Sequence, residues 1–237
     1  MYYSLSPYAF CGNDPVNCVD PDGRDWYSYE KYSEKDDDQE TCTVVYAWTN
    51  ASSQAELDAS GIKGTYLGEA VVVFKGSMNE RLGTKAKDPK GLYIDGEGAV
   101  PAVVTVYGPS GDDDIQQYTG FTMTSDYELF GAIAEGIYDV NYVLPGKSSP
   151  LPSNYVVNNG GPVDCVNGIN PSPEMFNPYS PTQKNGIYIH ATNSDGKAGG
   201  TIYASTGCLL IQGGKQWTDF NSQIGKRDFK LILNRGK

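Results

Sequence analysis

From residue 65 onward, short apolar runs alternate with clusters of Gly, Pro and Asp along this chain of 237 residues. Such runs are typical of strands, and the residues between them are typical of turns. The high counts of glycine (28), proline (14) and tyrosine (18) also favour strands and turns over long helices. We therefore expect a mostly β fold, a mixed sandwich or barrel of about eight strands with one or two short helices. The predicted strands are 69–75, 102–107, 115–123, 137–143, 186–190, 208–211 and 228–233.

Two segments have helical signals. Residues 53–60 open with Ser-Gln-Ala-Glu, which has the spacing of a capping box, and Gly61 can end the helix. Residues 214–225 carry apolar side chains at i, i+3 and i+7, and Gly225 can end this second helix. Those apolar positions are Trp217, Phe220 and Ile224.

Residues 144–185 form a long connection that is rich in Pro, Gly and Asn. A structureless loop of that length is uncommon in a compact domain. The segment therefore indicates either a functional insertion or a strand that the pattern does not reveal.

The N-terminal part of the chain differs in composition from the rest. Residues 1–25 are dense in turn dipeptides and have no helical or alternating period. Residues 26–64 contain a Tyr-rich acidic linker over 26–40, a strand over 41–49 and the first helix. Residues 65–237 are predicted to form the main domain.

The first 25 residues resemble the C-terminal end of the RHS-repeat core. The resemblance rests on YSLSPYAFCGNDPVN over residues 3–17, closing with DPDGR over 20–24. In that family this segment ends a conserved shell, and a variable effector domain follows. The resemblance implies the C-terminal piece of a larger RHS-type polymorphic protein, or a detached copy, with an RHS shell or an immunity protein as partner.

Charge and composition exclude several classes of function. The formal net charge of −11 argues against nucleic-acid binding, which needs cations to displace counterions from phosphate. No apolar run approaches the length of a membrane span. The chain opens without a signal peptide, so an export signal, if there is one, would lie upstream or belong to another system.

The cysteines and the single histidine limit the chemistry further. One imidazole excludes His-rich metal sites, and no cysteines form a CxxC pair, so we expect no metal and no organic cofactor. The odd number of cysteines leaves at least one thiol free or paired between chains. Up to two disulfides can form, and the sequence does not decide which cysteines they would join. The cysteines are Cys11, Cys18, Cys42, Cys165 and Cys208.

The histidine and one cysteine form a candidate catalytic pair. His190 ends the apolar run 186–190, and Cys208 follows a Ser-Thr-Gly turn and precedes an aliphatic run. A thiol near pKa 8.5 is a poor nucleophile until a neighbouring imidazolium stabilises its thiolate. Gly207 permits a tight turn, and the backbone amides of Gly207 and Cys208 can face a developing oxyanion. A buried cysteine and a structural histidine are the alternative interpretation.

This pattern resembles the catalytic core of L,D-transpeptidases of the YkuD type. That family has Ile-His-x at a strand end and then Ser-x-Gly-Cys, which correspond here to residues 189–191 and 205–208. Residues 135–140 (EGIYDV) are similar to the family's Pro-x-Gly-x-Tyr-x-Ile element, with Ala134 where proline is usual. The resemblance spans about residues 66–237 and implies a fold of the L,D-transpeptidase-like type.

The resemblance also implies roles for individual residues. Cys208 would be the nucleophile and His190 its general base, oriented by the backbone carbonyl of Ala191. Ser205 would shape the turn, and the amides of Gly207 and Cys208 would form the oxyanion hole.

Two positions depart from the family pattern. Thr206 stands where the family usually has histidine, and Leu210 where it usually has arginine or asparagine. Because these positions serve substrate recognition in the family, substrate binding must differ here. Candidate residues for substrate contact or a compensating charge are Tyr188, Tyr138, Thr206, Lys197 and Lys215.

The expected function is cysteine-dependent acyl transfer or amide hydrolysis on peptidoglycan stem peptides, or on another amide substrate, as the effector of an RHS-type protein. The alternative is a catalytically inactive binding or structural domain that retains the fold. A papain-like peptidase is disfavoured because His190 precedes Cys208 in the chain. The resemblance implies a location that is exported, at the cell surface or periplasmic.

Overall fold

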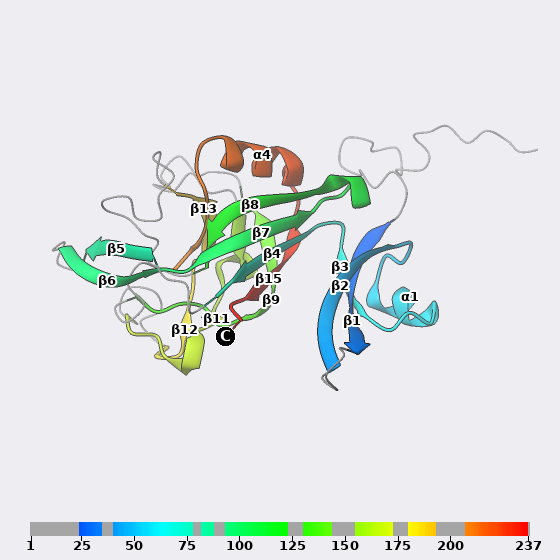
Figure 1. Ribbon diagram of the computed structural model, residues 1–237, viewed down its shortest axis with the longest axis horizontal. Helices are drawn as coiled ribbons and strands as arrows, with labels where there is room; N and C mark the ends of the chain where they lie inside the picture. Colours follow the sequence, from blue (N-terminus) through cyan, green and yellow to red (C-terminus); the bar gives the residue numbers. More distant parts are fainter. Residues whose placement is uncertain are drawn as a thin grey trace, which may run out of the picture. The chain divides into compact units, whose positions relative to one another are not determined.

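The computed structural model divides the chain into two compact units, Met1–Glu69 and Ala70–Lys237, which are described separately (Figure 1). The residues that the structure describes are 24–34, 40–77, 82–87, 93–122, 130–143, 155–172, 180–192 and 207–236. The predicted RHS-like segment lies almost entirely outside them.

The first unit contains a three-stranded antiparallel sheet. Strands β1 (Asp25–Glu34), β2 (Glu40–Thr49) and β3 (Thr65–Gly68) are arranged in the order β2-β1-β3. The side chain of Trp26 is fully buried and meets Trp48 edge to face, with ring centroids 4.8 Å apart. Aromatic pairs across strands stabilise sheets beyond the area they bury.

The linker predicted over residues 26–40 is wrong for its first nine residues, because they belong to β1. The aromatic residues of this segment are good strand formers, and the predicted strand 41–49 offers them a partner along its whole length. Acidity alone was therefore a poor guide to the structure of the segment.

The predicted first helix is confirmed as α1 (Gln54–Ala59). The Ser53 hydroxyl accepts a hydrogen bond from the Glu56 N–H, as a capping box requires. The Glu56 carboxylate reaches back to the N–H of Ser52 rather than to that of Ser53. Gly61, at φ +74°, ends the helix in the left-handed region that glycine favours.

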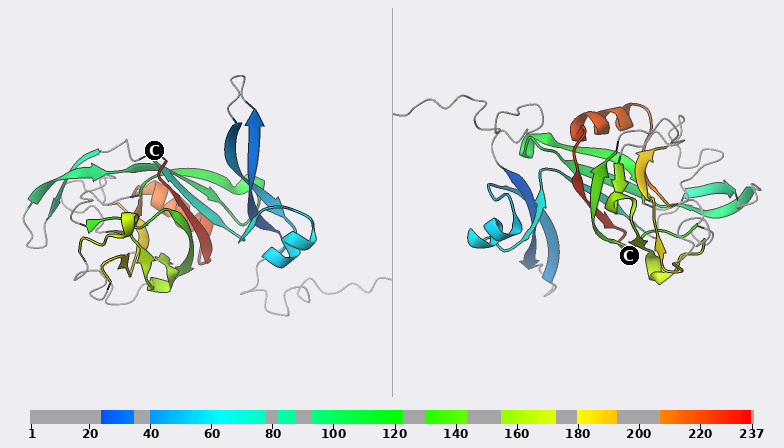
Figure 2. Two further views of the ribbon diagram at one scale, coloured as in Figure 1. Left: turned by 90° about the horizontal axis from the view of Figure 1, so that it is seen from below. Right: turned by 180° about the vertical axis from the view of Figure 1, so that it is seen from behind.

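The second unit is built on a closed eight-stranded barrel with strand order β10-β13-β14-β8-β7-β4-β15-β9 (Figure 1 and Figure 2). The pairs β13–β14 and β4–β15 are parallel, and the other pairs are antiparallel. The mostly β prediction, a mixed barrel with short helices, is thus confirmed. The barrel strands are β4 (Val71–Gly76), β7 (Pro101–Tyr107), β8 (Ile115–Phe121), β9 (Gly136–Tyr142), β10 (Tyr155–Val157), β13 (Tyr188–Ala191), β14 (Leu209–Ile211) and β15 (Phe229–Asn234).

The core of the barrel is completed by helix α4 (Lys215–Ile224), as its apolar spacing predicts. Phe220 is fully buried and its ring meets those of Tyr118, Tyr155 and Phe229 edge to face. Truncating such a side chain to alanine costs roughly 3–5 kcal/mol of stability. Helix α4, which connects β14 to β15 in the chain, therefore contributes to the stability of the barrel core.

Several strands were not predicted. Strands β10, β11 (Val163–Asp164) and β12 (Gln183–Lys184) lie within the connection 144–185, so this segment contains missed strands. They are two or three residues long and are separated by turns in which Asn158, Asn159 and Asn167 adopt positive φ. Strands of two or three residues are too short to show an alternation of apolar and polar side chains.

The hairpin of β5 (Leu82–Lys87) and β6 (Tyr93–Ala99) was also missed. Its strands contain glycines and charged residues rather than an apolar run. The sequences of the two strands therefore lack the pattern from which strand propensity would predict them.

Candidate active site

The parallel pairing of β13 and β14 brings the histidine and Cys208 onto one face of the sheet. Ile189 pairs with Leu209, and both side chains are fully buried in the barrel core. Because successive side chains alternate between the faces of a strand, those of His190 and Cys208 point away from that core. Both are half-buried rather than sealed.

The imidazole of His190 is held by two partners. Its Nδ1 donates to the backbone carbonyl of Ala191, 2.9 Å away, and the thiol of Cys208 is close enough to the ring to raise its pKa. With the proton on Nδ1, Nε2 is the nitrogen that can take a proton from sulfur. The structure therefore places the Ala191 carbonyl where it selects the tautomer that a general base needs.

Electrostatics favour the protonated imidazole. Burial by itself lowers the pKa of His190, but the hydrogen bond and charge of Cys208, with the Ala191 carbonyl, outweigh it and raise the pKa above its usual value. A raised imidazole pKa is the counterpart of a stabilised thiolate, because each charge favours the other. A thiolate at Cys208 and an imidazolium at His190 would therefore stabilise each other.

The sulfur of Cys208 has a backbone donor as well. The N–H of Tyr188 points to Sγ at 3.4 Å. An N–H aimed at sulfur stabilises the charged form. The predicted substrate residue Tyr188 therefore contributes through its main chain, and its side chain is half-buried.

Gly207 is required by its conformation and by its surroundings. Its φ of +151° lies in a region that other residues rarely adopt. A Cβ placed there would lie 3.3 Å from both Ile187 Cδ1 and Lys184 Nζ. The turn before Cys208 therefore has room for glycine alone without movement of its neighbours.

Lys184, which sequence reasoning missed, lies beside this turn. Its side chain is completely buried, and Nζ donates to the backbone carbonyl of Phe130. Burial lowers its pKa to about 8, opposed by the charges of Cys165 and Cys208. A lysine in a Gly- and Asn-containing segment gives no signal of burial, because its neighbours are distant in sequence.

Cys165 is the second thiol near Lys184. It is buried, and it forms an isolated antiparallel bridge with Ile133. Burial raises the pKa of its thiol, and Lys184 offsets only part of that effect. No disulfide joins the described cysteines Cys42, Cys165 and Cys208 to one another.

The remaining predicted residues make contacts of their own or are not described. Lys215 is exposed on α4 and forms an ion pair with Asp219, so it is a surface residue. The Tyr138 hydroxyl donates to the Ala134 carbonyl at 2.6 Å, and the ring packs on the barrel core. Leu210 is buried against Phe121. Ser205, Thr206 and Lys197 lie outside the described residues.

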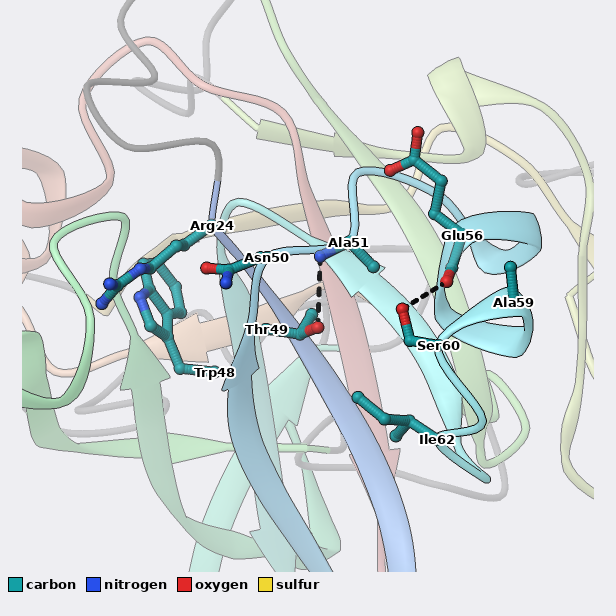
Figure 3. A pocket seen from close by; sticks show the side chains of 9 residues that line it. All are labelled: Arg24, Trp48, Thr49, Asn50, Ala51, Glu56, Ala59, Ser60 and Ile62. Carbon is teal, nitrogen blue, oxygen red and sulfur yellow. Dashed lines mark hydrogen bonds between the residues drawn. The ribbon is translucent and has the colours of Figure 1, made fainter.

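A separate cavity of about 710 Å³ lies in the first unit (Figure 3). It contains neither thiol nor imidazole, and it is distinct from the Cys208 site. Its polar groups are partly used within the unit, since the Ser60 hydroxyl donates to the Glu56 carbonyl at 2.8 Å. Its walls are Arg24, Trp48, Thr49, Asn50, Ala51, Glu56, Ala59, Ser60 and Ile62.

Neither a metal centre nor a membrane helix is found in the part of the chain that the structure describes. No group of three or more His, Cys, Asp or Glu there could hold a metal ion. No helix there is long and apolar enough to cross a bilayer.

Comparisons with protein families, with curated proteins and with solved structures gave no match. The arrangement around Cys208 and His190 therefore carries the functional argument.

Proposed function

We propose that the second unit is a cysteine-dependent acyltransferase or amide hydrolase that acts on peptidoglycan stem peptides. The observation that carries the proposal is the contact between His190 and Cys208, with Nδ1 of the histidine held by the Ala191 carbonyl. A nucleophile in contact with a base that a third group orients is the arrangement covalent catalysis needs. The substrate class rests on the resemblance to L,D-transpeptidases.

The reaction would begin with proton transfer from Cys208 to Nε2 of His190. The thiolate attacks the amide carbonyl carbon, and the C–S bond forms as the carbonyl π electrons move to oxygen. The amides of Gly207 and Cys208 would stabilise that oxyanion. Collapse breaks the C–N bond, and the imidazolium gives its proton to the leaving amine.

The resulting thioester would be resolved by water or by an acceptor amine. His190 takes the proton of the incoming nucleophile, the C–S bond breaks, and the thiolate of Cys208 is restored. Water yields hydrolysis, and an amine yields transpeptidation. Leu210, buried against Phe121, offers no polar group at a position where the family has one, so substrate recognition must use other residues.

The RHS-like N-terminal residues support a further part of the proposal. They suggest that the catalytic unit is the effector of an RHS-type polymorphic toxin, working outside the cytoplasm and neutralised by an immunity protein. Directing the chain to the periplasm of a test bacterium should arrest growth, and Cys208→Ala should abolish the arrest.

The enzymatic proposal is tested with purified tetrapeptide and pentapeptide muropeptides. The full chain, Cys208→Ala and the matched control Cys165→Ala are incubated with them, and products and protein adducts are followed by mass spectrometry. We expect an acyl adduct on Cys208, turnover by wild type and Cys165→Ala, and a loss of at least about 10³-fold in Cys208→Ala.

Equal turnover by wild type and Cys208→Ala would reject this mechanism. A folded wild type that binds muropeptides without forming an adduct or turning them over would favour the second candidate, a binding domain that retains the fold. The apolar Leu210 is the observation that favours this candidate.

A further inference from the structure

Lys184 is a buried cation next to the candidate nucleophile. It belongs to β12 and has no exposed surface. Its Nζ donates to the Phe130 carbonyl and lies 3.3 Å from the position that a Cβ of Gly207 would occupy. The ammonium therefore lies directly behind the turn that carries Cys208.

Two thiols lie within electrostatic range of this ammonium, those of Cys165 and Cys208. Cys165 is buried and is displaced toward its neutral form. Cys208 is only half-buried, accepts a hydrogen bond from the Tyr188 N–H and lies beside the His190 imidazole. Cys208 therefore has more groups around it than Cys165 that can stabilise a thiolate together with the lysine.

We propose that Lys184 is a positioning residue of the Cys208 site, whose buried ammonium stabilises the Cys208 thiolate. The inference rests on the proposed function and deepens it. The thiolate would be held by three groups of different kinds: a backbone N–H, an imidazole and an ammonium.

The test is the pH dependence of Cys208 carbamidomethylation in the full chain, read peptide by peptide by mass spectrometry. Wild type, Lys184→Met and Lys184→Gln are compared, and each is checked for cooperative thermal unfolding. A thiolate that loses a nearby cation titrates at higher pH. We expect the midpoint to rise by about one pH unit in both variants, with labelling at pH 6.5 slowed about 10-fold.

Comparing the two variants separates the effect of the Lys184 charge from that of its hydrogen bond to the Phe130 carbonyl. Glutamine can still donate to the Phe130 carbonyl and methionine cannot, so a structural role predicts a wild-type midpoint in Lys184→Gln and a change in Lys184→Met only. That result, or an unchanged midpoint in both folded variants, would overturn the inference and leave the proposed function standing. A wild-type midpoint equal to that of free cysteine would instead overturn the proposed function.

Discussion

Cys165 and Cys208 share one lysine but occupy different environments. Cys165 is buried beside the bridge to Ile133, and burial raises its pKa. Cys208 is half-exposed, receives the Tyr188 N–H and contacts the imidazole of His190. Proximity to a cation is therefore insufficient to make a reactive thiol. A proton acceptor, a backbone donor and access to solvent distinguish the two sites.

Removing the imidazole should abolish most of the difference in reactivity between Cys208 and Cys165. In His190→Gln, Cys208 loses its proton acceptor and its strongest specific partner. A thiol near pKa 8.5 is only about 1% ionised at pH 6.5, so we expect Cys208 labelling at that pH to fall about 10- to 100-fold. Rates of iodoacetamide labelling measure this.

Cys165→Ala is the matched comparison for that variant, and its Cys208 labelling should stay within about twofold of wild type. An unchanged rate in His190→Gln would show that the imidazole does not activate Cys208.

The second change addresses the turn that presents Cys208. Gly207→Ala imposes a Cβ at φ +151° and 3.3 Å from Lys184 Nζ and Ile187 Cδ1. Backbone strain of this kind costs about 1–3 kcal/mol, and displacement of the sulfur should also slow labelling. Urea unfolding and Cys208 labelling measure the two effects.

Gly186→Ala is the control for strain without crowding, since Gly186 has φ +63° but open space around the Cβ position. It should destabilise the fold less than Gly207→Ala does and leave labelling unchanged. Equal effects of the two substitutions would show that the closeness of Lys184 and Ile187 to Gly207 adds nothing to the backbone strain.

The lysine predicts a smaller, pH-dependent effect on stability. The pKa of Lys184 is lowered from 10.5 to about 8 in the folded chain, so between those values the unfolded chain binds more protons. Stability must then rise with pH over that window, and the destabilising effect of the buried charge is greatest below about pH 8. The stability of wild type relative to Lys184→Met, measured by urea unfolding, should therefore rise between about pH 8 and pH 10.5. A constant difference would contradict the lowered pKa.

The smallest effect is expected at Cys165. Cys165→Ala removes one buried sulfur, and a change of this size costs about 1 kcal/mol or less. The Cys208 midpoint should not move, because Cys165 is largely neutral. A shift in that midpoint would show that the two thiols titrate together.

Much of the barrel was predictable, because its longer strands and helix α4 have apolar patterns with turn residues between them. The site was predictable only where chemistry and sequence position coincide: one histidine at a strand end and a cysteine after a glycine. Lys184 was not predictable, since its burial depends on Phe130 and Gly207, which approach it only in the folded barrel. The strands β10 to β12 were too short to leave a period.

Competitive labelling of the native chain at pH 6.5 tests the central claim most directly. Limiting iodoacetamide is added to the full chain with a free cysteine peptide as internal standard, and Cys208 and Cys165 are quantified together. We predict that Cys208 reacts at least about 10-fold faster than the standard and that Cys165 is protected. Labelling of Cys208 no faster than the standard would contradict an activated nucleophile.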